Sequence, residues 1–108
     1  MPVPKGIKHS KIFNMDTQTG ILRLTYNSAW GHYAFHWESH CGEFVEDGEG
    51  EVTEIIRDFH GKNNPNWFIE KAERELDLEL AQGNIKKGDS WCYLWELENG
   101  KIENSHFC

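Results

Sequence analysis

The N-terminus of the sequence lacks a long apolar run. Residues Met1 to Lys8 interrupt single apolar side chains with Pro, Gly and Lys. A secretory signal needs at least about seven consecutive apolar residues, and a membrane-spanning helix needs about twenty. Neither can be placed here, so we expect a cytoplasmic protein with no membrane partner.

Cysteine is also scarce. The chain has three, Cys41, Cys92 and Cys108, and none of them forms a Cys-x-x-Cys pair. An odd number without such a pair argues against a disulfide framework and against a zinc site built from four thiolates. We therefore expect free thiols in a reducing cytosol.

Basic residues are outnumbered by acidic ones. There are 11 Lys and Arg against 18 Asp and Glu, so the formal net charge is −7. Direct nucleic-acid binding depends on clustered Lys and Arg, so we do not expect a nucleic-acid ligand. Residues 41–82 carry four bases and twelve acids, a net charge of −8, whereas residues 1–40 carry a net charge of +2. A concentrated negative segment attracts basic protein surfaces, although acids can also serve only to keep helices soluble.

Aromatic residues are abundant, at 13% of 108 residues with 5 Trp. A chain of this length supports one core, so residues 1–108 are predicted to form a single globular domain. Strand signals occur at Ile12–Phe13 and Ile21–Tyr26, separated by turn formers, and at 32–37, where large and small residues alternate. Residues 91–98 alternate in the same way and precede Asn99-Gly100, which predicts a closing hairpin with Glu98 opposite Lys101 and Leu97 opposite Ile102.

Two helices are predicted between these strands. Helical spacing places four apolar side chains on one face: Val52, Ile55, Ile56 and Phe59. After Gly61, a second helix of about 18 residues begins at Pro65 with Asn64 as its N-cap and ends at Gly83-Asn84. Residues 43–51, with five acids and two glycines, are typical of a solvated loop. The predicted fold class is α+β, with an antiparallel sheet of N-terminal strands plus a C-terminal hairpin packed against two α-helices. Trp37 and Trp95 are expected in the core, and Trp30 and Trp67 at the surface.

Catalytic patterns are missing. The sequence has no Gly-x-Ser-x-Gly turn, no phosphate-binding loop and no EF-hand spacing, so we expect a protein that is not an enzyme and has no cofactor. One cluster has metal-ligand residue types: His32, His36, His40 and Cys41. On a strand, His32 and His36 would lie about 13 Å apart, too far to share one zinc ion. A metal-binding module or metal-dependent enzyme using His36, His40, Cys41 and His60 remains the alternative, and His106 could join it only through the fold.

The run Asn27 to Trp37 resembles a group of small bacteriophage- and prophage-encoded proteins with no assigned activity. The residues that carry the resemblance are Trp30, Gly31, Tyr33 and Trp37, followed by Ile55, Ile56 and Phe59 and by Trp67-Phe68-Ile69. It covers residues 20 to 75, and the acidic insertion at 43–51 departs from the shorter connection of the group. The resemblance implies a phage or prophage accessory protein in the host cytoplasm.

These observations lead to one functional hypothesis and two alternatives. The hypothesis is a non-enzymatic accessory protein that binds a host protein with a basic surface, and inhibits a nucleic-acid-handling defence system such as CRISPR or restriction. Its predicted partner-binding residues are Glu43, Glu46, Asp47, Glu49, Glu51, Glu54 and Asp58, with Trp30 and Trp67. The alternatives are the metal site above and a self-association module in which Trp91, Tyr93 or Trp95 form the interface. The chain is expected to be a monomer or a small homo-oligomer.

Overall fold

The structure is a computed structural model that describes residues 19–42, 44–46, 51–57 and 65–108. Within these ranges the elements, in chain order, are β1 (Gly20–Asn27), β2 (His32–Ser39), β3 (Phe44–Glu46), α2 (Glu51–Ile56), α3 (Pro65–Gln82), β4 (Trp91–Glu98) and β5 (Lys101–Phe107).

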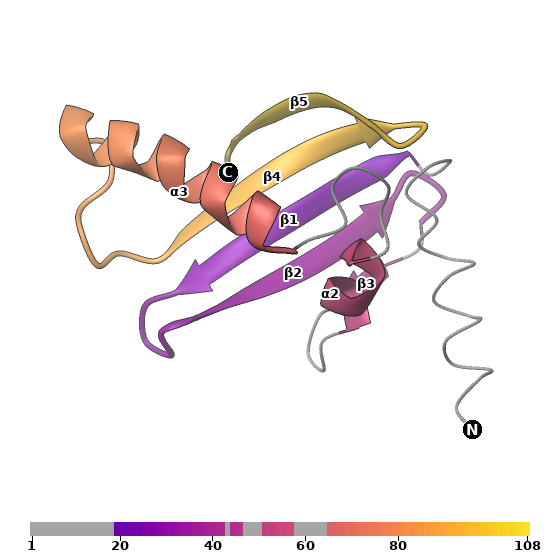
Figure 1. Cartoon of the computed structure of the whole chain (residues 1–108), viewed down its shortest axis with the longest axis horizontal. Coiled ribbons are helices and arrows are strands. Elements are labelled where there is room, and N and C mark those ends of the chain that lie inside the picture. The colour runs from indigo at the N-terminus through magenta and orange to yellow at the C-terminus, as the bar shows by residue number, and fades with distance from the viewer. Residues whose placement is uncertain (1–18, 43, 47–50, 58–64) are drawn as a thin grey trace.

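The strands form one antiparallel sheet in the order β3-β2-β1-β4-β5 (Figure 1). The predicted α+β class is confirmed to this extent: five antiparallel strands, drawn from the N-terminal half and a C-terminal hairpin, accompany two helices in the described ranges. β1 is central because it pairs with both β2 and β4. It approaches β2 closely at Gly20, where any Cβ would collide with the backbone of Glu38 and Ser39. The strand predicted at Ile12–Phe13 lies outside the described residues.

The core lies on one face of the sheet, because successive side chains of a strand point to opposite faces. Leu22 and Leu24 of β1 are fully buried, and they pair in register with large residues of β2 and β4. Trp37 and Trp95 are both 0% exposed, as predicted. The same buried cluster includes residues of both helices, namely Val52 and Ile56 of α2 and Phe68 and Ala72 of α3.

Helix α3 begins and ends where the sequence predicts. It starts at Pro65, whose fixed φ suits a first helical position, and spans 18 residues. At its end the Gly83 N–H donates to the Leu80 carbonyl and the Asn84 N–H donates to the Glu79 carbonyl, which is the Schellman pattern of C-terminal capping. The predicted N-cap, Asn64, lies outside the described residues.

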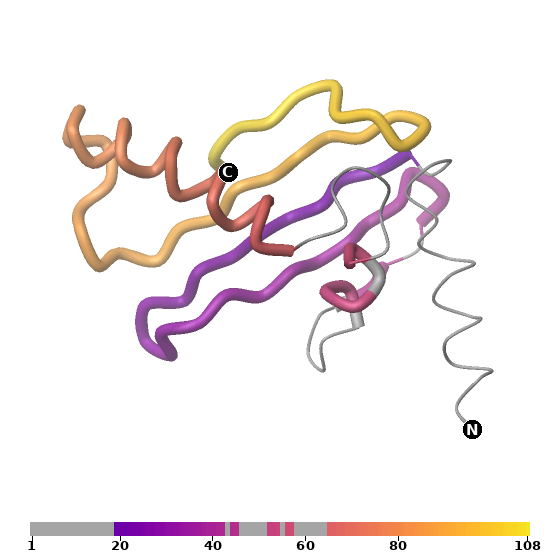
Figure 2. Tube along the Cα trace, in the orientation of Figure 1, coloured from indigo at the N-terminus to yellow at the C-terminus, as the bar shows by residue number. Residues whose placement is uncertain are grey.

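The structure also confirms the predicted C-terminal hairpin. Asn99 and Gly100 both have positive φ, 53° and 78°, as a two-residue type I′ turn requires. Glu98 pairs with Lys101 and Leu97 with Ile102. Beyond these pairs the register shifts between Glu96 and Leu97, so the edge strand β5 contains a bulge. Figure 2 traces the β1–β2 and β4–β5 hairpins as two neighbouring pairs of one sheet.

The segment predicted as an acidic loop is in part a strand, so that prediction is wrong for Phe44–Glu46. These residues form β3 and pair with His36, Trp37 and Glu38 of β2. Val45 anchors the strand, because its side chain is 8% exposed. Helix α2 follows with Val52 and Ile56 buried as the helical spacing predicts, whereas Phe59 and Gly61 lie outside the described residues.

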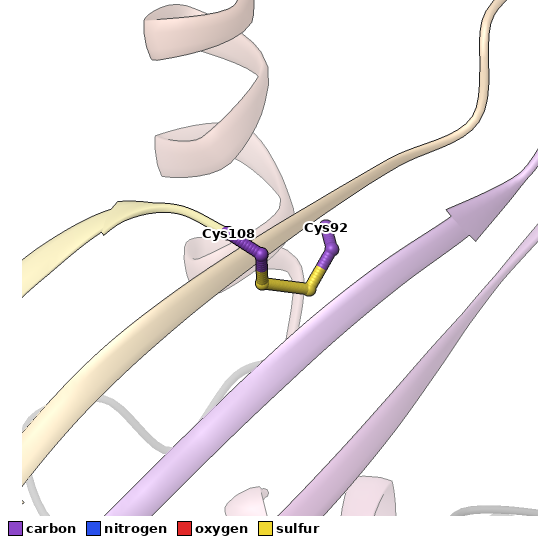
Figure 3. Close-up of a disulfide and its surroundings, with 2 residues drawn as sticks. All are labelled: Cys92 and Cys108. Atoms are coloured by element: carbon purple, nitrogen blue, oxygen red, sulfur yellow. A yellow bond between two sulfur atoms is a disulfide. The ribbon is translucent and has the colours of Figure 1, made fainter.

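The expectation of free cysteines is wrong for two of the three. Cys92 on β4 and Cys108 form a disulfide with a Cα–Cα distance of 5.4 Å (Figure 3). The Cys108 N–H also donates to the Cys92 carbonyl at 2.9 Å. Because β5 folds back antiparallel on β4, residues 16 apart in sequence meet at the open end of the hairpin. Cys41 is a free, exposed thiol.

Candidate functional site

The acids predicted to bind a partner are only partly described. Glu46 belongs to strand β3 and Glu51 begins helix α2, while Glu54 is exposed on α2. Four of them lie outside the described residues: Glu43, Asp47, Glu49 and Asp58. The role of these seven acids in binding a partner therefore stays a prediction.

A second group of acids is fully described and is not among the predicted partner-binding residues. Glu70, Glu73 and Asp77 are all exposed on α3. Because they are three and four residues apart, they are neighbours along one side of the helix. We call these three residues the acidic flank of α3. Arg74 follows Glu70 by one turn and borders the flank, which remains net negative. Helical spacing could have identified the flank, had it been applied to acids as well as to apolar residues.

The acidic flank is joined to the sheet through Tyr33 of β2. The Tyr33 hydroxyl donates a hydrogen bond to Oε2 of Glu73. Burial raises the pKa of Tyr33 well above its usual range, and the hydrogen bond to Glu73 and the negative charge of that carboxylate raise it further. The phenol is therefore a neutral donor at physiological pH. It holds one carboxylate of the flank in a fixed position.

A cavity of about 360 Å³ lies beside this contact. It is lined from all three neighbouring elements: by Tyr33 and Phe35 of β2, Thr53 of α2, Arg57 after α2, and Pro65, Asn66 and Ile69 of α3. Its lining combines an aromatic wall, several polar groups and the exposed guanidinium of Arg57.

The two tryptophans predicted at the surface differ. Trp30 is 71% exposed in the β1–β2 turn, with its ring stacked on His32 at a centroid distance of 5.5 Å. The turn is held by the Gly31 N–H, which donates to the Asn27 carbonyl. Trp67 is instead half-buried, and its ring contacts Phe68 edge-on at 5.0 Å, so the prediction of exposure is wrong for Trp67. Trp30 is thus in a hairpin turn and Trp67 is in α3.

The histidines lie on or after a strand, as the alternation predicts. His32 and His36 belong to β2, and His40 and Cys41 follow it as exposed residues. Among the residues that the structure describes, no group of three His, Cys, Asp or Glu side chains could hold a metal ion. His60 lies outside this set. His40 instead lines a small cavity of about 170 Å³ together with Glu96, Glu98 and Glu103.

The aromatic residues proposed for self-association are in the core. Trp91 is 9% exposed, Tyr93 is 2% exposed and Trp95 is 0% exposed. An interface between copies cannot use side chains that are already buried within one copy, so this form of the alternative is wrong.

The fold and these surfaces define an α+β protein with an acidic helix flank and no recognisable catalytic constellation in its described residues. None of the described helices is long and apolar enough to cross a membrane. The chain is similar to the chloroplastic ATP synthase epsilon chain of Citrus sinensis, with 30% identity over 71 residues, 66% of this chain and 47% of that protein. The corresponding protein of Nicotiana tabacum is 31% identical over 70 residues, 65% of this chain and 46% of its own length. The chain thus spans about half the length of the curated relatives it matches. No protein-family model and no solved structure matches the chain.

Proposed function

We propose that the protein is a non-enzymatic accessory protein that binds a basic surface of another protein through the acidic flank of α3. The observation that carries the proposal is the exposure of Glu70, Glu73 and Asp77 along one side of an 18-residue helix. Carboxylates on a regular helix present a fixed row of charge, which favours encounter with a positively charged surface and excludes partners of like charge.

The contact between Tyr33 and Glu73 supports this role. A long charged side chain loses rotamer freedom when it binds, and that loss weakens an ion pair. The hydrogen bond from Tyr33 already orders Glu73 in the free protein. The flank is therefore partly prepared for binding before the partner arrives.

The similarity to other proteins is compatible with a role in binding a partner protein. The relatives are named as one chain of an ATP synthase, and a chain of a named assembly has protein neighbours. The narrower form of the hypothesis, a phage or prophage accessory protein that inhibits a host defence complex, rests on the residue pattern at Asn27–Trp37 and stays a prediction. Such complexes carry basic surfaces that hold nucleic acid, which is the surface that an acidic flank would contact.

A pair of charge-reversal variants tests the proposal. Glu70→Lys with Asp77→Lys reverses two exposed acids of the flank and leaves Glu73 bonded to Tyr33. Glu98→Lys with Glu103→Lys makes the same change in net charge on the exposed C-terminal hairpin. Each immobilised variant is mixed with lysate of the source cells at low and high salt, and bound proteins are quantified by mass spectrometry.

We expect the wild-type chain to retain a partner at low salt, because salt screens exposed charges. The flank variant should retain about tenfold less of it, and the hairpin variant should behave like the wild type. Equal loss in both variants would mean that only the net charge matters. Full retention by the flank variant would show that the acidic flank is not the binding surface.

A further inference from the structure

The larger cavity, between β2 and the two helices, has no role in the proposed binding of a partner. Strand β3 pairs only with His36, Trp37 and Glu38 of β2, so Tyr33 and Phe35 lie on the part of β2 that extends past it. These two side chains point to the core face, on the side of the sheet where α2 and α3 lie (Figure 1). The cavity volume of about 360 Å³ is within the range of about 300–1,000 Å³ that small-molecule pockets have, and voids in packed cores are far smaller.

The cavity has an apolar interior and a polar opening. Phe35 is 2% exposed and closes its floor, whereas the half-buried side chains of Tyr33 and Ile69 keep accessible surface along its wall. Arg57 and Asn66 are exposed, so they border the opening. A ligand would therefore place an apolar body against the wall and a polar group at the opening.

The charge of the lining limits the class of ligand. Arg57 is the one charged residue among the described residues that line the cavity. Its main-chain N–H donates to the Thr53 carbonyl at 3.2 Å, which continues the last turn of α2 and fixes the point from which the side chain extends. Within the described ranges no carboxylate forms an ion pair with the Arg57 guanidinium. A planar guanidinium binds a carboxylate through two parallel hydrogen bonds, so a ligand carboxylate would fit here.

The acids beside the cavity restrict this ligand to a single negative charge. Glu73 accepts the hydrogen bond from Tyr33 and so lies next to the wall. Glu54 and Glu70 are exposed and adjacent in sequence to two residues of the lining. These acids would repel a ligand with two negative charges, whereas one carboxylate is balanced by Arg57.

We propose that the cavity binds a small monocarboxylate with a compact apolar body, of which benzoate is a simple aromatic example. The carboxylate lies at the opening against Arg57, and the apolar body packs on Tyr33 and Ile69 above Phe35. Burial of the apolar body contributes affinity, and the guanidinium selects the charge. Because such a ligand has few atoms, we expect a dissociation constant of about 1 mM for benzoate.

NMR titration of the full chain with three probes at constant ionic strength tests the site. Benzoate has both the carboxylate and the apolar body, benzamide has the same shape without the charge, and inorganic phosphate has charge without an apolar body. Benzoate should shift the amide signals of Tyr33, Phe35 and Ile69 to saturation. Benzamide and phosphate should bind at least about tenfold more weakly, because each lacks one of the two complementary features.

Three results with these probes would overturn the proposal. Equal binding of benzamide would show that the cavity does not select a carboxylate. Equal binding of phosphate would show that it selects charge alone. The third result is the absence of a saturable shift at benzoate concentrations well above the expected dissociation constant.

Arginine variants test the role of Arg57. Arg57→Gln should weaken benzoate binding by about tenfold or more and leave benzamide binding unchanged, while Arg57→Lys should weaken it less, because it keeps the charge but loses the planar fork. Arg74→Gln is the matched control, because Arg74 is an exposed arginine of α3 outside the cavity and its loss changes the net charge equally. Thermal melting checks that each variant is folded. Equal weakening by Arg57→Gln and Arg74→Gln would contradict a specific contact at Arg57.

The cavity and the acidic flank can be tested independently. Glu70→Lys with Asp77→Lys leaves every lining residue of the cavity in place, so this variant should bind benzoate at least as tightly as the wild type while it loses the partner protein. Loss of benzoate binding in this variant, with an unchanged melting temperature, would mean that the flank and not the cavity holds the ligand.

Discussion

Replacing Phe68 with Ala tests how firmly α3 is packed on the sheet. Phe68 is fully buried, and its ring contacts Trp95 at 4.8 Å, Trp67 at 5.0 Å and Phe35 at 6.4 Å, each edge-on. Removal of a buried Phe side chain costs about 3–5 kcal/mol, and an edge-on aromatic contact adds about 0.5–1.5 kcal/mol beyond the buried area. With three such contacts, the expected loss in the free energy of unfolding is near the upper limit for a buried Phe, about 4–5 kcal/mol. A domain of this size has a free energy of unfolding of about 5–15 kcal/mol, so the variant should be close to unfolding.

Urea denaturation followed by tryptophan fluorescence measures this loss as a lower midpoint at an unchanged slope. Leu78→Ala is the matched control, because Leu78 is on the same helix but 56% exposed. It should change the free energy of unfolding by less than about 1 kcal/mol. If Phe68→Ala is no more destabilising than Leu78→Ala, α3 does not pack on the sheet through this ring, and the acidic flank loses the support that fixes its direction.

Two further predictions follow from the disulfide and from Tyr33. Changing Cys92 and Cys108 to Ser should lower the free energy of unfolding by about 3 kcal/mol, which is the loop-entropy value for cysteines 16 residues apart. Calorimetry measures this loss, and an unchanged melting temperature would contradict a disulfide formed in solution. The raised pKa of Tyr33 contributes stability that is fully present below the ordinary tyrosine pKa of about 10 and is lost as pH rises above it, since the unfolded chain then releases the phenolic proton first. Tyr33→Phe should therefore flatten the fall of melting temperature between about pH 9 and 11, and an identical fall in both proteins would exclude this linkage.

The sequence predicts those parts of the fold that local chemistry decides. The Asn99-Gly100 turn sets the register of β4 and β5, since both residues adopt positive φ without strain. Pro65 and Gly83 likewise define the ends of α3 through their own backbone preferences. The order of the strands in the sheet cannot be predicted from local chemistry, because the neighbouring strands β1 and β4 are distant in sequence. Their pairing depends on how both faces pack and not on any turn between them.

The short strand β3 and the disulfide cannot be predicted from local sequence patterns. Strand β3 has only three residues, too few for an alternating pattern, and it is held by pairing with β2 and by burial of Val45. The number of cysteines does not predict the disulfide, because it carries no information about the distances between them. Cys92 and Cys108 meet because the hairpin brings their Cα atoms to 5.4 Å.

The distribution of charge shows why counting acidic residues along the sequence does not identify the candidate surface. Along the chain, the acids concentrate in residues 41–82 and are densest around residue 47. In space, helix period and strand period decide which charges meet. Period 3.6 places Glu70 beside Glu73, and period 2 with the strand registers places Arg23 on the same face of the sheet as Glu38 and Glu96, although Glu38 and Glu96 lie outside the acidic segment. Because the charge reversals on α3 and on the C-terminal hairpin change the net charge equally, any difference between their effects on partner binding must come from the position of the charges, and this difference is what the proposed function predicts.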